Sequence, residues 1–472
     1  MLLSDDLLLN YKRCTRRAYL NTFGSLEERD PLSPFLLKLR KETEKHKNQV
    51  LLDLFPVYHQ LQTPNHDKET LAQKTLSLMQ QGVECIYRGV LLHQEEKYTL
   101  LATPDLLIKQ PGKSKFGDWY YFPISIQFGR RPKPEYKLIV TFHALLLFAL
   151  QGVFPTKSEI VLRDQKIYSV YIQSWIPRLR EILQECSKML QTKEEPEVFI
   201  SRQRCSLCSW YSHCYAIASS QQHLSLVPGV TPNRYQQLQS VGVATLSSLA
   251  TISPTNISEL IGNDITFQLQ KQAQSILENR AILKQTRVNH LPTADIEIYF
   301  DIEAEPEINV DYLLGILIVD RQANTEIFYP FLAEKPEEER TIWEQFLAKV
   351  SVYTEAPIFH YSPYEVETIK RLAQLYNSPK EKIEPLLSRC VDLHKLVVSS
   401  IIFPVESYSL KSIANWLGFT WRDRGVTGDQ TVCWYDQWLN TGDRSLLAAI
   451  LRYNEDDCRA TYHLKNWLVE FL

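Results

Sequence analysis

Two short acidic clusters in the C-terminal part of the chain contain residues that could bind metal ions and hydrolyse a phosphodiester. Asp301 and Glu303 form a D-x-E pair, and Asp457 closes a second cluster that begins at Tyr453. Carboxylate oxygens are the ligands that Mg²⁺ and Mn²⁺ prefer, and two such ions can stabilise the attacking and leaving oxygens of a phosphodiester. A lone D-x-E pair is also common on a solvated strand, so the argument depends on the elements that carry these acids.

A strand and a later helix are expected to position the acids. Apolar residues alternate with others over 296–300, which predicts a half-buried strand. Asp301 and Glu303 then point to the same face, because side chains alternate along a strand. Apolar residues recur at helical spacing over 446–468, so Asp457 is expected on a helix.

The order of the motifs resembles that of the DnaQ-like branch of the RNase H fold, 3′-5′ exonucleases that use four acidic residues. An apolar segment containing Gly315 follows the first acids, and then come a strand ending at His360 and a helix opening near Pro363. The sequence SYSLKSIANWLGF is typical of an RNase H-like subgroup linked to RecB-like nucleases. Tyr453 and Asp457 have the Y-x3-D spacing of the third motif.

This resemblance implies a site for two divalent ions, Mg²⁺ or Mn²⁺, in which Tyr453 orients the attacking water. The implied ligands are Asp301, Glu303, Glu365 and Asp457. Glu365 departs from the family pattern, in which Asp is commoner at that position.

Other polar residues near these motifs have a structural interpretation beside a functional one. His360 could act as a general base, but a histidine that ends an apolar strand is more often a packing residue. Asp392 is a weaker candidate ligand. Glu455 and Asp456 cannot share the helix face of Asp457, so we expect them to be solvated.

A second possible cofactor site is formed by cysteines. Cys205, Cys208 and Cys214 have the spacing C-x2-C-x5-C, and Cys14 lies far upstream. Nine cysteines without an evident signal peptide or membrane span indicate a reducing, cytoplasmic location, where clustered thiols bind metal more often than they form disulfides. The arrangement resembles the iron-staple RecB-like nucleases and implies a [4Fe–4S] cluster, with Zn²⁺ as the alternative.

The region between these cysteines resembles the RecB-like nucleases of the PD-(D/E)XK superfamily. His46 and Asp105 match two positions of the family's active site. Ser125 and Gln127 stand where the family has an acidic ligand and a lysine, and neither can replace an anionic ligand or a cationic amine. We therefore expect a catalytically degenerate domain that binds nucleic acid.

Local basic segments are the expected contacts to nucleic acid, because the formal net charge of −3 leaves no overall basic surface. Arg130, Arg131 and Lys133 follow the degenerate motif and could contact phosphates. Farther along, the turn at Gly229 resembles a helix-hairpin-helix module, whose backbone N–H groups bind phosphates without reading sequence. An ordinary solvated face and an ordinary helical linker are the respective alternatives.

The 472 residues are therefore predicted to form an α/β multidomain protein. We expect a restriction-endonuclease-like (PD-(D/E)XK) domain at 1–220, a helix-hairpin-helix-like linker at 221–290 and an RNase H-like exonuclease domain at 291–472. The implied function is a metal-dependent nuclease, a 3′-5′ exonuclease on DNA, acting in repair with a possible helicase or repair partner and without a membrane. The alternatives are a non-hydrolytic nucleic-acid-binding scaffold and a ribonuclease.

Overall fold

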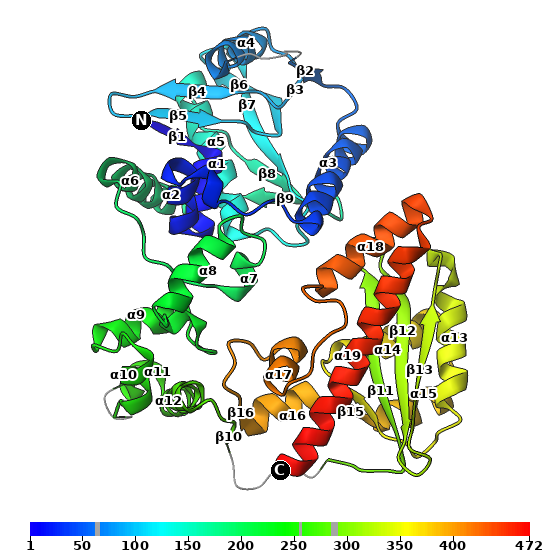
Figure 1. The fold of residues 1–472 in the computed structure, drawn as a ribbon. Helices are drawn as coiled ribbons and strands as arrows, with labels where there is room; N and C mark the ends of the chain where they lie inside the picture. The colour runs from blue at the N-terminus through cyan, green and yellow to red at the C-terminus, as the bar shows by residue number, and fades with distance from the viewer. Residues whose placement is uncertain (62–66, 254–256, 285–290) are drawn as a thin grey trace. The chain divides into compact units, whose positions relative to one another are not determined.

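The computed structural model describes residues 1–61, 67–253, 257–284 and 291–472 (Figure 1). Within these ranges the chain forms two compact units, Met1–Ile217 and Ala218–Leu472. The sequence-based boundary between residues 290 and 291 lies at the edge of 285–290, which is outside the described residues. No helix in the described ranges combines the length and apolar character needed to cross a membrane.

The first unit contains a mixed six-stranded sheet and a smaller three-stranded sheet. The larger sheet has the order β2 (His59–Gln60), β3 (Cys85–Tyr87), β6 (Leu106–Ser114), β7 (Gly117–Ile126), β8 (Ser158–Val161) and β9 (Ile167–Val170). The smaller sheet has the order β1 (Leu2–Ser4), β5 (Thr99–Ala102) and β4 (Leu91–Gln94). The helices are α1 (Asp5–Arg13), α2 (Thr15–Phe23), α3 (Pro34–Leu54), α4 (Lys68–Gln80), α5 (Pro134–Gln151), α6 (Ile176–Thr192), α7 (Arg202–Cys205) and α8 (Tyr211–Ser220).

A single crossover explains how this sheet buries its long helix. β7 runs antiparallel to β6 and parallel to β8, and a parallel pair needs a connection of helical length, which α5 supplies. The middle of α5 is mostly apolar and is buried on nearly all sides, and Leu138, Val140 and Phe142 are completely buried. A helix of that composition is stable only inside a core.

The second unit begins with a run of helices, the last of which is hydrogen-bonded to the sheet domain that follows. These helices are α9 (Pro232–Ser240), α10 (Leu246–Thr251), α11 (Ser258–Ile261) and α12 (Asn263–Glu278). The Gln272 side chain on α12 donates to the Phe403 carbonyl at 2.6 Å and accepts from the Tyr408 hydroxyl at 2.9 Å. β10 (Ile282–Leu283) pairs antiparallel with β16 (Ile401–Ile402). The helical segment and the sheet domain therefore share buried polar contacts.

The rest of the second unit is a five-stranded sheet with helices on both faces (Figure 1). Its strand order is β13 (Thr325–Leu332), β12 (Val310–Asp320), β11 (Ile296–Glu305), β14 (Ile358–His360) and β15 (Cys390–Asp392). β11, β12 and β13 are antiparallel neighbours, whereas β14 is parallel to both β11 and β15. The helices are α13 (Glu339–Val350), α14 (Tyr364–Leu375), α15 (Lys380–Ser388), α16 (Leu393–Ser400), α17 (Leu410–Trp416), α18 (Gly428–Thr441) and α19 (Arg444–Phe471).

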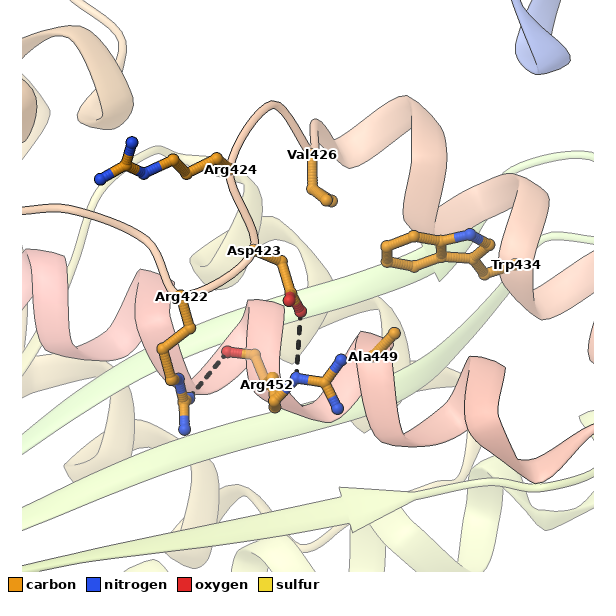
Figure 2. Close-up of a pocket in the computed structure, with 7 residues that line it drawn as sticks. All are labelled: Arg422, Asp423, Arg424, Val426, Trp434, Ala449 and Arg452. Atoms are coloured by element: carbon orange, nitrogen blue, oxygen red, sulfur yellow. Dashed lines mark hydrogen bonds and ion pairs between the residues drawn. The ribbon is translucent and has the colours of Figure 1, made fainter.

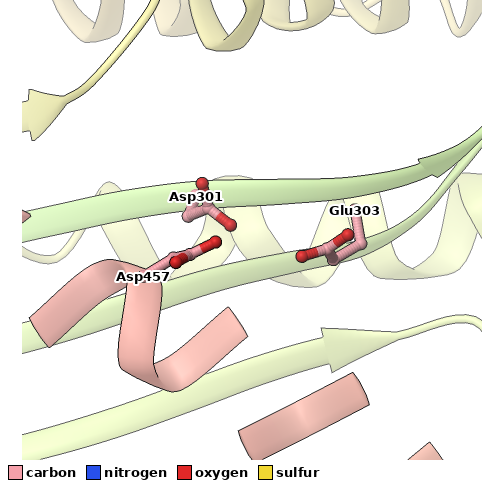
Figure 3. A group of neighbouring side chains, drawn as sticks. All are labelled: Asp301, Glu303 and Asp457. Carbon is pink, nitrogen blue, oxygen red and sulfur yellow. The ribbon is translucent and has the colours of Figure 1, made fainter. Parts of the chain in front are cut away.

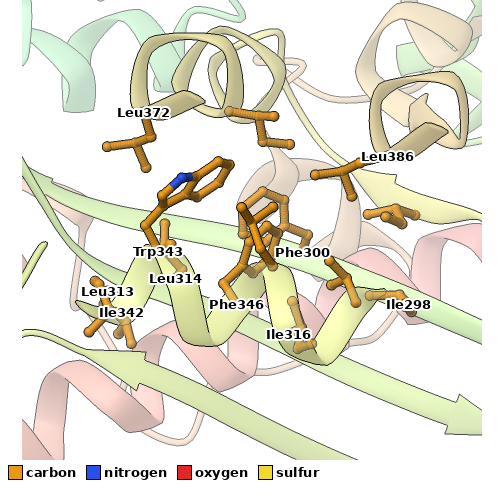
Figure 4. Packing of buried hydrophobic residues seen from close by; sticks show 14 of the residues in the cluster. Ile298, Phe300, Leu313, Leu314, Ile316, Ile342, Trp343, Phe346, Leu372 and Leu386 are labelled. Carbon is orange, nitrogen blue, oxygen red and sulfur yellow. The ribbon is translucent and has the colours of Figure 1, made fainter. Parts of the chain in front are cut away.

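The two faces of β11 meet different helices, as the alternating sequence predicts. On one face the Phe300 ring stacks 4.8 Å from the Phe346 ring of α13, within a large apolar cluster (Figure 4). On the other face the Tyr299 ring lies 5.0 Å from the Tyr462 ring of α19. Because side chains alternate, Asp301 and Glu303 lie on the face of Tyr299, toward α19.

A buried ion pair fixes α19 on this face. Lys465 Nζ binds Glu297 Oε1, and neither side chain is exposed by more than 2 %. Glu297 Oε2 accepts hydrogen bonds from Tyr299 Oη at 2.6 Å and from Arg321 Nε at 3.0 Å. A buried charge pair contributes little net stability but tolerates few alternative arrangements, so it sets the position of the helix along the strand.

Candidate metal centre

Three carboxylates meet where β11 faces α19. One ligand oxygen from each of Asp301, Glu303 and Asp457 lies within 4.8 Å of the others, and Figure 3 shows the three side chains converging. Over the described parts of the chain, no other group of three or more histidine, cysteine or acidic residues is as close. Glu303 is buried, while Asp301 and Asp457 are partly exposed.

A neutral side chain holds each of these carboxylates in place. Asn454 Nδ2 donates to Asp301 Oδ2 at 2.7 Å. Thr431 Oγ1 donates to Glu303 Oε2 at 2.6 Å, and Trp421 Nε1 donates to Asp457 Oδ1 at 2.7 Å. These three bonds use one oxygen of each acid and leave the other available for a cation. Donors of this kind orient metal ligands in proteins.

Burial raises the pKa values of all three acids, and the charges of neighbouring acids add to this effect. Burial is the larger cause for Asp301, whose pKa lies well above its usual value, followed by the charges of Asp457, Glu303 and Glu365. Burial and the charge of Asp457 raise the pKa of Glu303 to about 8. Burial raises the pKa of Asp457 to about 7, although the Trp421 hydrogen bond and the Lys411 charge lower it. Each acid therefore binds a proton readily in the absence of a cation.

The residues fit a hard divalent cation. No arginine or lysine forms an ion pair with these three carboxylates among the described residues. Lys411 is the nearby cation, and its ammonium donates to the Val426 carbonyl and lies 5.5 Å from the centre of the Trp421 ring. An all-oxygen site with excess negative charge suits Mg²⁺ or Mn²⁺.

Tyr453 lies beside Asp457 on the same face of α19. Its side chain is 8 % exposed, and its hydroxyl is close enough to the Asp457 carboxyl group to lower the pKa of that acid. Burial, followed by the charge of Asp457, raises the pKa of Tyr453. The phenol is therefore neutral and can donate or accept a hydrogen bond at the edge of the acidic group.

Glu365 is near the three acids but outside their group. It lies in the first turn of α14 and is buried, and Ser362 Oγ donates to its Oε2 at 2.7 Å. His360 Nδ1 is 3.5 Å from the same oxygen and 2.6 Å from the Ser362 carbonyl oxygen. Asp392 caps α16 by accepting from the Lys395 backbone N–H at 3.0 Å. The described structure thus brings three of the four expected ligands together and keeps Glu365 in its own polar contacts.

The expectation that Glu455 and Asp456 are solvated is wrong. Arg422 donates to Asp456 from its backbone N–H and from Nε, both at 2.8 Å, and Asp456 is only 4 % exposed. Glu455 binds Arg422 and Arg459. Helical spacing correctly predicts that Glu455 and Asp456 do not share the face of Asp457. The face that they do occupy is covered by the segment around Arg422, so it is not open to solvent.

Sequence reasoning missed the residues that orient the acids. Thr431 and Trp421 belong to motif-free stretches, so their types and spacing give no signal. Asn454 follows Tyr453 directly in sequence. The one residue that could have indicated its role is Gly315, which pairs with Asp301 across the sheet and leaves space for another side chain. A Cβ atom on Gly315 would lie 1.7 Å from Asn454 Oδ1, so this close approach requires glycine.

The four cysteines of the predicted cluster lie in the described part of the first unit, close enough for their charges to interact, but no three of their sulfurs lie within 4.8 Å of one another. Cys14 separates α1 from α2, and its charge raises the pKa values of Cys205, Cys208 and Cys214, after the larger effect of burial. Cys14 Sγ accepts from the Arg17 backbone N–H at 3.4 Å, and Cys205 Sγ accepts from the Ser201 N–H at 3.3 Å. Burial raises the pKa values of Cys208 and Cys214, whereas the Trp210 backbone lowers that of Cys208 and the Arg16 side chain lowers that of Cys214.

The predicted degenerate site contains one carboxylate, and a lysine holds it. Asp105 Oδ1 accepts from Lys47 Nζ at 2.7 Å, and Oδ2 accepts from the Ile126 backbone N–H at 2.7 Å. Ser125 Oγ is 3.4 Å from Asp105, and Gln127 donates to Ser125 at 2.7 Å. His46 is buried on α3 with its ring 5.7 Å from that of Phe128. This set does not fit a divalent cation, because Lys47 already balances the charge of Asp105.

The residues expected to contact phosphates lie at the surface of the first unit and at a turn of the second. Arg130, Arg131 and Lys133 are exposed in the segment between β7 and α5. Gly229 has a φ of 91°, in the left-handed region, and its carbonyl accepts from Arg234 Nη1 at 2.7 Å.

Comparison with known proteins supports the prediction of an RNase H-like domain in the C-terminal part of the chain. A protein-family model described as the RNase_H superfamily matches residues 298–469. No curated protein matches the chain. The matched segment contains the three convergent acids together with Glu365 and Tyr453. The match supports an RNase H-like domain at the C-terminus and suggests a nuclease-type activity on nucleic acid, and nucleases of this superfamily typically use divalent metals.

Proposed function

We propose that this protein is a divalent-metal-dependent 3′-5′ exonuclease that acts on DNA through the acidic group of its C-terminal domain. The observation that carries the proposal is the convergence of Asp301, Glu303 and Asp457, each oriented by a neutral donor and with its pKa raised. A structural acidic cluster would be expected to have arginine or lysine partners, as the Glu297–Lys465 pair in this domain has.

The side chains of the site have separate roles in this proposal. Asp301, Glu303 and Asp457 would hold two divalent ions, and Glu365 would join them if its carboxylate turned away from Ser362. Ions bound there would supply a nucleophilic hydroxide near neutral pH and stabilise the charge of the phosphodiester oxygens. Tyr453 would orient the attacking water through its hydroxyl, while Asn454, Thr431 and Trp421 keep the carboxylates in position.

The first unit would serve as a nucleic-acid-binding platform without hydrolytic activity of its own. The Lys47–Asp105 pair leaves no acidic site for a cation there, and Arg130, Arg131 and Lys133 are exposed and available to phosphates. The turn at Gly229 in the second unit would add backbone contacts of the helix-hairpin-helix type.

The four neighbouring cysteines would bind a [4Fe–4S] cluster, with Zn²⁺ as the alternative. Cys14 Sγ and Cys205 Sγ each accept a backbone hydrogen bond, and such bonds stabilise metal-bound thiolates and tune iron–sulfur clusters. Iron, acid-labile sulfide and zinc should be quantified in protein purified without oxygen. Iron and sulfide that disappear in Cys205→Ser support the cluster, whereas one zinc per chain would replace it.

A non-hydrolytic scaffold is the second candidate, and the contacts of Glu365 favour it. Ser362 and His360 hold this carboxylate outside the acidic group, so a fourth ligand requires a rearrangement. In that case the domain would bind nucleic acid without cleaving it.

Hydrolysis of end-labelled single- and double-stranded DNA and RNA with Mn²⁺ or Mg²⁺ separates these possibilities. Wild type should shorten a 5′-labelled DNA strand stepwise, and Asp105→Asn should behave like wild type, whereas Asp301→Asn should lose activity by at least about a hundredfold. Loss of activity in Asp105→Asn alone would place catalysis in the first unit. Binding of every substrate without cleavage would favour the scaffold.

A further inference from the structure

A pocket containing three arginines lies beside the acidic group, within the second unit. It has a volume of ≈ 470 Å³ and is lined by Arg422, Asp423, Arg424, Val426, Trp434, Ala449 and Arg452 (Figure 2). This volume lies in the range of sites for small molecules and nucleotides. Its lining residues come from α18, α19 and the segment 421–426, which connects α17 to α18.

Two contacts attach this segment to the metal centre, one at each end. Trp421 Nε1 donates to Asp457 Oδ1 at 2.7 Å, and the Val426 carbonyl accepts from the ammonium of Lys411. Lys411 in turn is close enough to Asp457 to lower the pKa of that acid. A molecule in the pocket therefore contacts a segment that also supports a metal ligand.

The pocket is also close to the acids along α19. Arg452 precedes Asp457 by five residues, which is about 7.5 Å along the helix axis and about 140° around it at about 3.6 residues per turn. Ala449, which also lines the pocket, lies one turn before Tyr453 on the face that carries Asp457. A chain molecule with one unit in the pocket could place a neighbouring unit at the acids.

The charges of the pocket favour an anion that also has an aromatic part. Arg424 forms no ion pair or hydrogen bond with any described residue. Arg452 binds Asp423 through Nε at 3.0 Å, and its two Nη groups have no partner among the described residues. Arg422 is already neutralised by Glu455 and Asp456. Trp434 is half-buried and borders the pocket with its ring (Figure 2).

We propose that this pocket binds one nucleotide of a single-stranded nucleic acid, next to the bond that the acidic group hydrolyses. Arg424 and Arg452 contact its phosphate, and the Trp434 ring stacks on its base. Asp423 opposes the phosphate and limits affinity, which helps the strand to move after each cleavage. The inference rests on the proposed function for the position of the scissile bond, but not for the binding of the strand.

The test is binding of fluorescent single-stranded DNA and RNA to the full chain, in an Asp301→Asn background without added metal. Arg424→Ala and Arg452→Ala should each weaken binding about five- to tenfold and reduce the slope of log affinity against log salt by about 0.7. Trp434→Leu should weaken binding about tenfold, whereas Trp434→Phe should retain most of the affinity because it can still stack. Equal unfolding temperatures would show that the variants remain folded.

Asp423→Asn gives the opposite and more discriminating result. Removing this carboxylate should tighten binding several-fold, because it removes repulsion from the phosphate and frees Arg452. Two matched changes on α13, which packs on the opposite face of the sheet from α19, should have no effect: Arg340→Ala and Glu344→Gln, whose exposed side chains bind each other.

Each outcome bears on either the pocket or the nuclease. If Arg424→Ala, Arg452→Ala and Trp434→Leu all bind single strands as well as wild type does, the pocket does not bind a nucleotide. The same conclusion follows if the wild-type protein binds no single strand. Weaker binding in Asp423→Asn would also contradict nucleotide binding there. If the chain hydrolyses no substrate but these variants lose binding as described, the proposed function is contradicted while nucleotide binding in the pocket is supported. The DNA and RNA arms show which sugar it accepts.

Discussion

Asn454 can reach Asp301 because the residue opposite on β12 has no side chain. Gly315 pairs with Asp301 across the antiparallel strands, and Asn454 Oδ1 occupies the space of its missing Cβ. This oxygen is buried and has no hydrogen-bond partner among the described residues. The oxygen faces the Gly315 backbone, and Nδ2 of the same amide donates to the Asp301 carboxylate.

Gly315→Ala should therefore disturb both stability and metal binding. The new methyl group would displace Asn454, and overpacking of this kind costs about 1–3 kcal/mol of unfolding free energy. Denaturant unfolding and Mn²⁺ titration measure the two effects. In Gly315→Ala/Asn454→Ala, stability should recover because the clash is gone, while Mn²⁺ affinity should stay low. Gly428→Ala is the control, since a Cβ there meets no atom within 4 Å. Full stability in the single variant would contradict this interpretation.

The raised pKa values of the acids predict how the stability of the metal-free protein depends on pH. Glu303 and Asp457 have pKa values of about 8 and about 7 in the folded state, and that of Asp301 is also raised, mainly by burial. Unfolded acids titrate near about pH 4. Between about pH 4 and 8 the folded protein therefore binds more protons than the unfolded chain, and its stability falls as the pH rises.

Thermal unfolding of metal-free protein from pH 5 to pH 8.5 tests this sign. The unfolding temperature of wild type should fall more than that of Asp301→Asn/Glu303→Gln/Asp457→Asn, which has no carboxylates to ionise at this site. Mn²⁺ should stabilise wild type more at pH 8 than at pH 6, because it competes with fewer protons. Equal pH dependence in the two proteins would show that these acids titrate normally.

At the scale of elements, the position of α19 along β11 decides whether Asp457 meets Asp301 and Glu303. The Glu297–Lys465 pair sets that position, since both side chains are almost fully buried and Tyr299 and Arg321 also bind Glu297. Lys465 follows Asp457 by two helical turns, so a shift of the helix at this pair would move the metal ligand as well.

Lys465→Met should be strongly destabilising. It leaves the Glu297 carboxylate buried without its lysine, which costs about 3–5 kcal/mol, and Glu297→Gln in the same protein should restore part of this loss. Chemical unfolding and Mn²⁺ affinity are the measurements. Lys370→Met is the control, because Lys370 is exposed and has no ion pair within the described ranges. A loss below about 1 kcal/mol would mean that the pair does not fix α19.

The sequence permitted prediction of the elements that carry the acids but not of the residues around them. Alternation before Asp301 correctly predicted a strand with both acids on one face, and helical spacing correctly placed Asp457 on a helix. Trp421 and Asp456 show what local patterns cannot give. Trp421 donates to Asp457, which is 36 residues away in sequence. Asp456 is covered by Arg422, which is 34 residues away. Such contacts arise from tertiary packing, which periodicity does not encode.

At the scale of the whole molecule, the chain forms two compact units that adjoin near residue 217, and the helices expected at 221–290 belong to the same unit as the sheet domain. α12 contributes Gln272 and Ser275 to polar contacts around residues 402 and 403, and β10 pairs with β16. The helical segment thus covers a strand edge of the C-terminal domain, which would otherwise be open to pairing with other chains.

This division predicts the behaviour of fragments. Residues 218–472 should fold alone and bind Mn²⁺ as the full chain does, whereas residues 291–472 should be less stable by at least about 2 kcal/mol and prone to aggregate. Chemical unfolding and size-exclusion chromatography compare the two. Equal stability of the fragments would show that the helical segment is an independent linker.

The binding of Mn²⁺ at pH 8, followed by the electron paramagnetic resonance of the free ion, tests the central claim most directly. Wild type should bind two more ions per chain than Asp301→Asn/Glu303→Gln/Asp457→Asn, and Asp105→Asn should bind as many as wild type. If wild type and the triple variant bind equal amounts of Mn²⁺, the three convergent carboxylates are not a metal centre, and the proposed hydrolysis has no site in this domain.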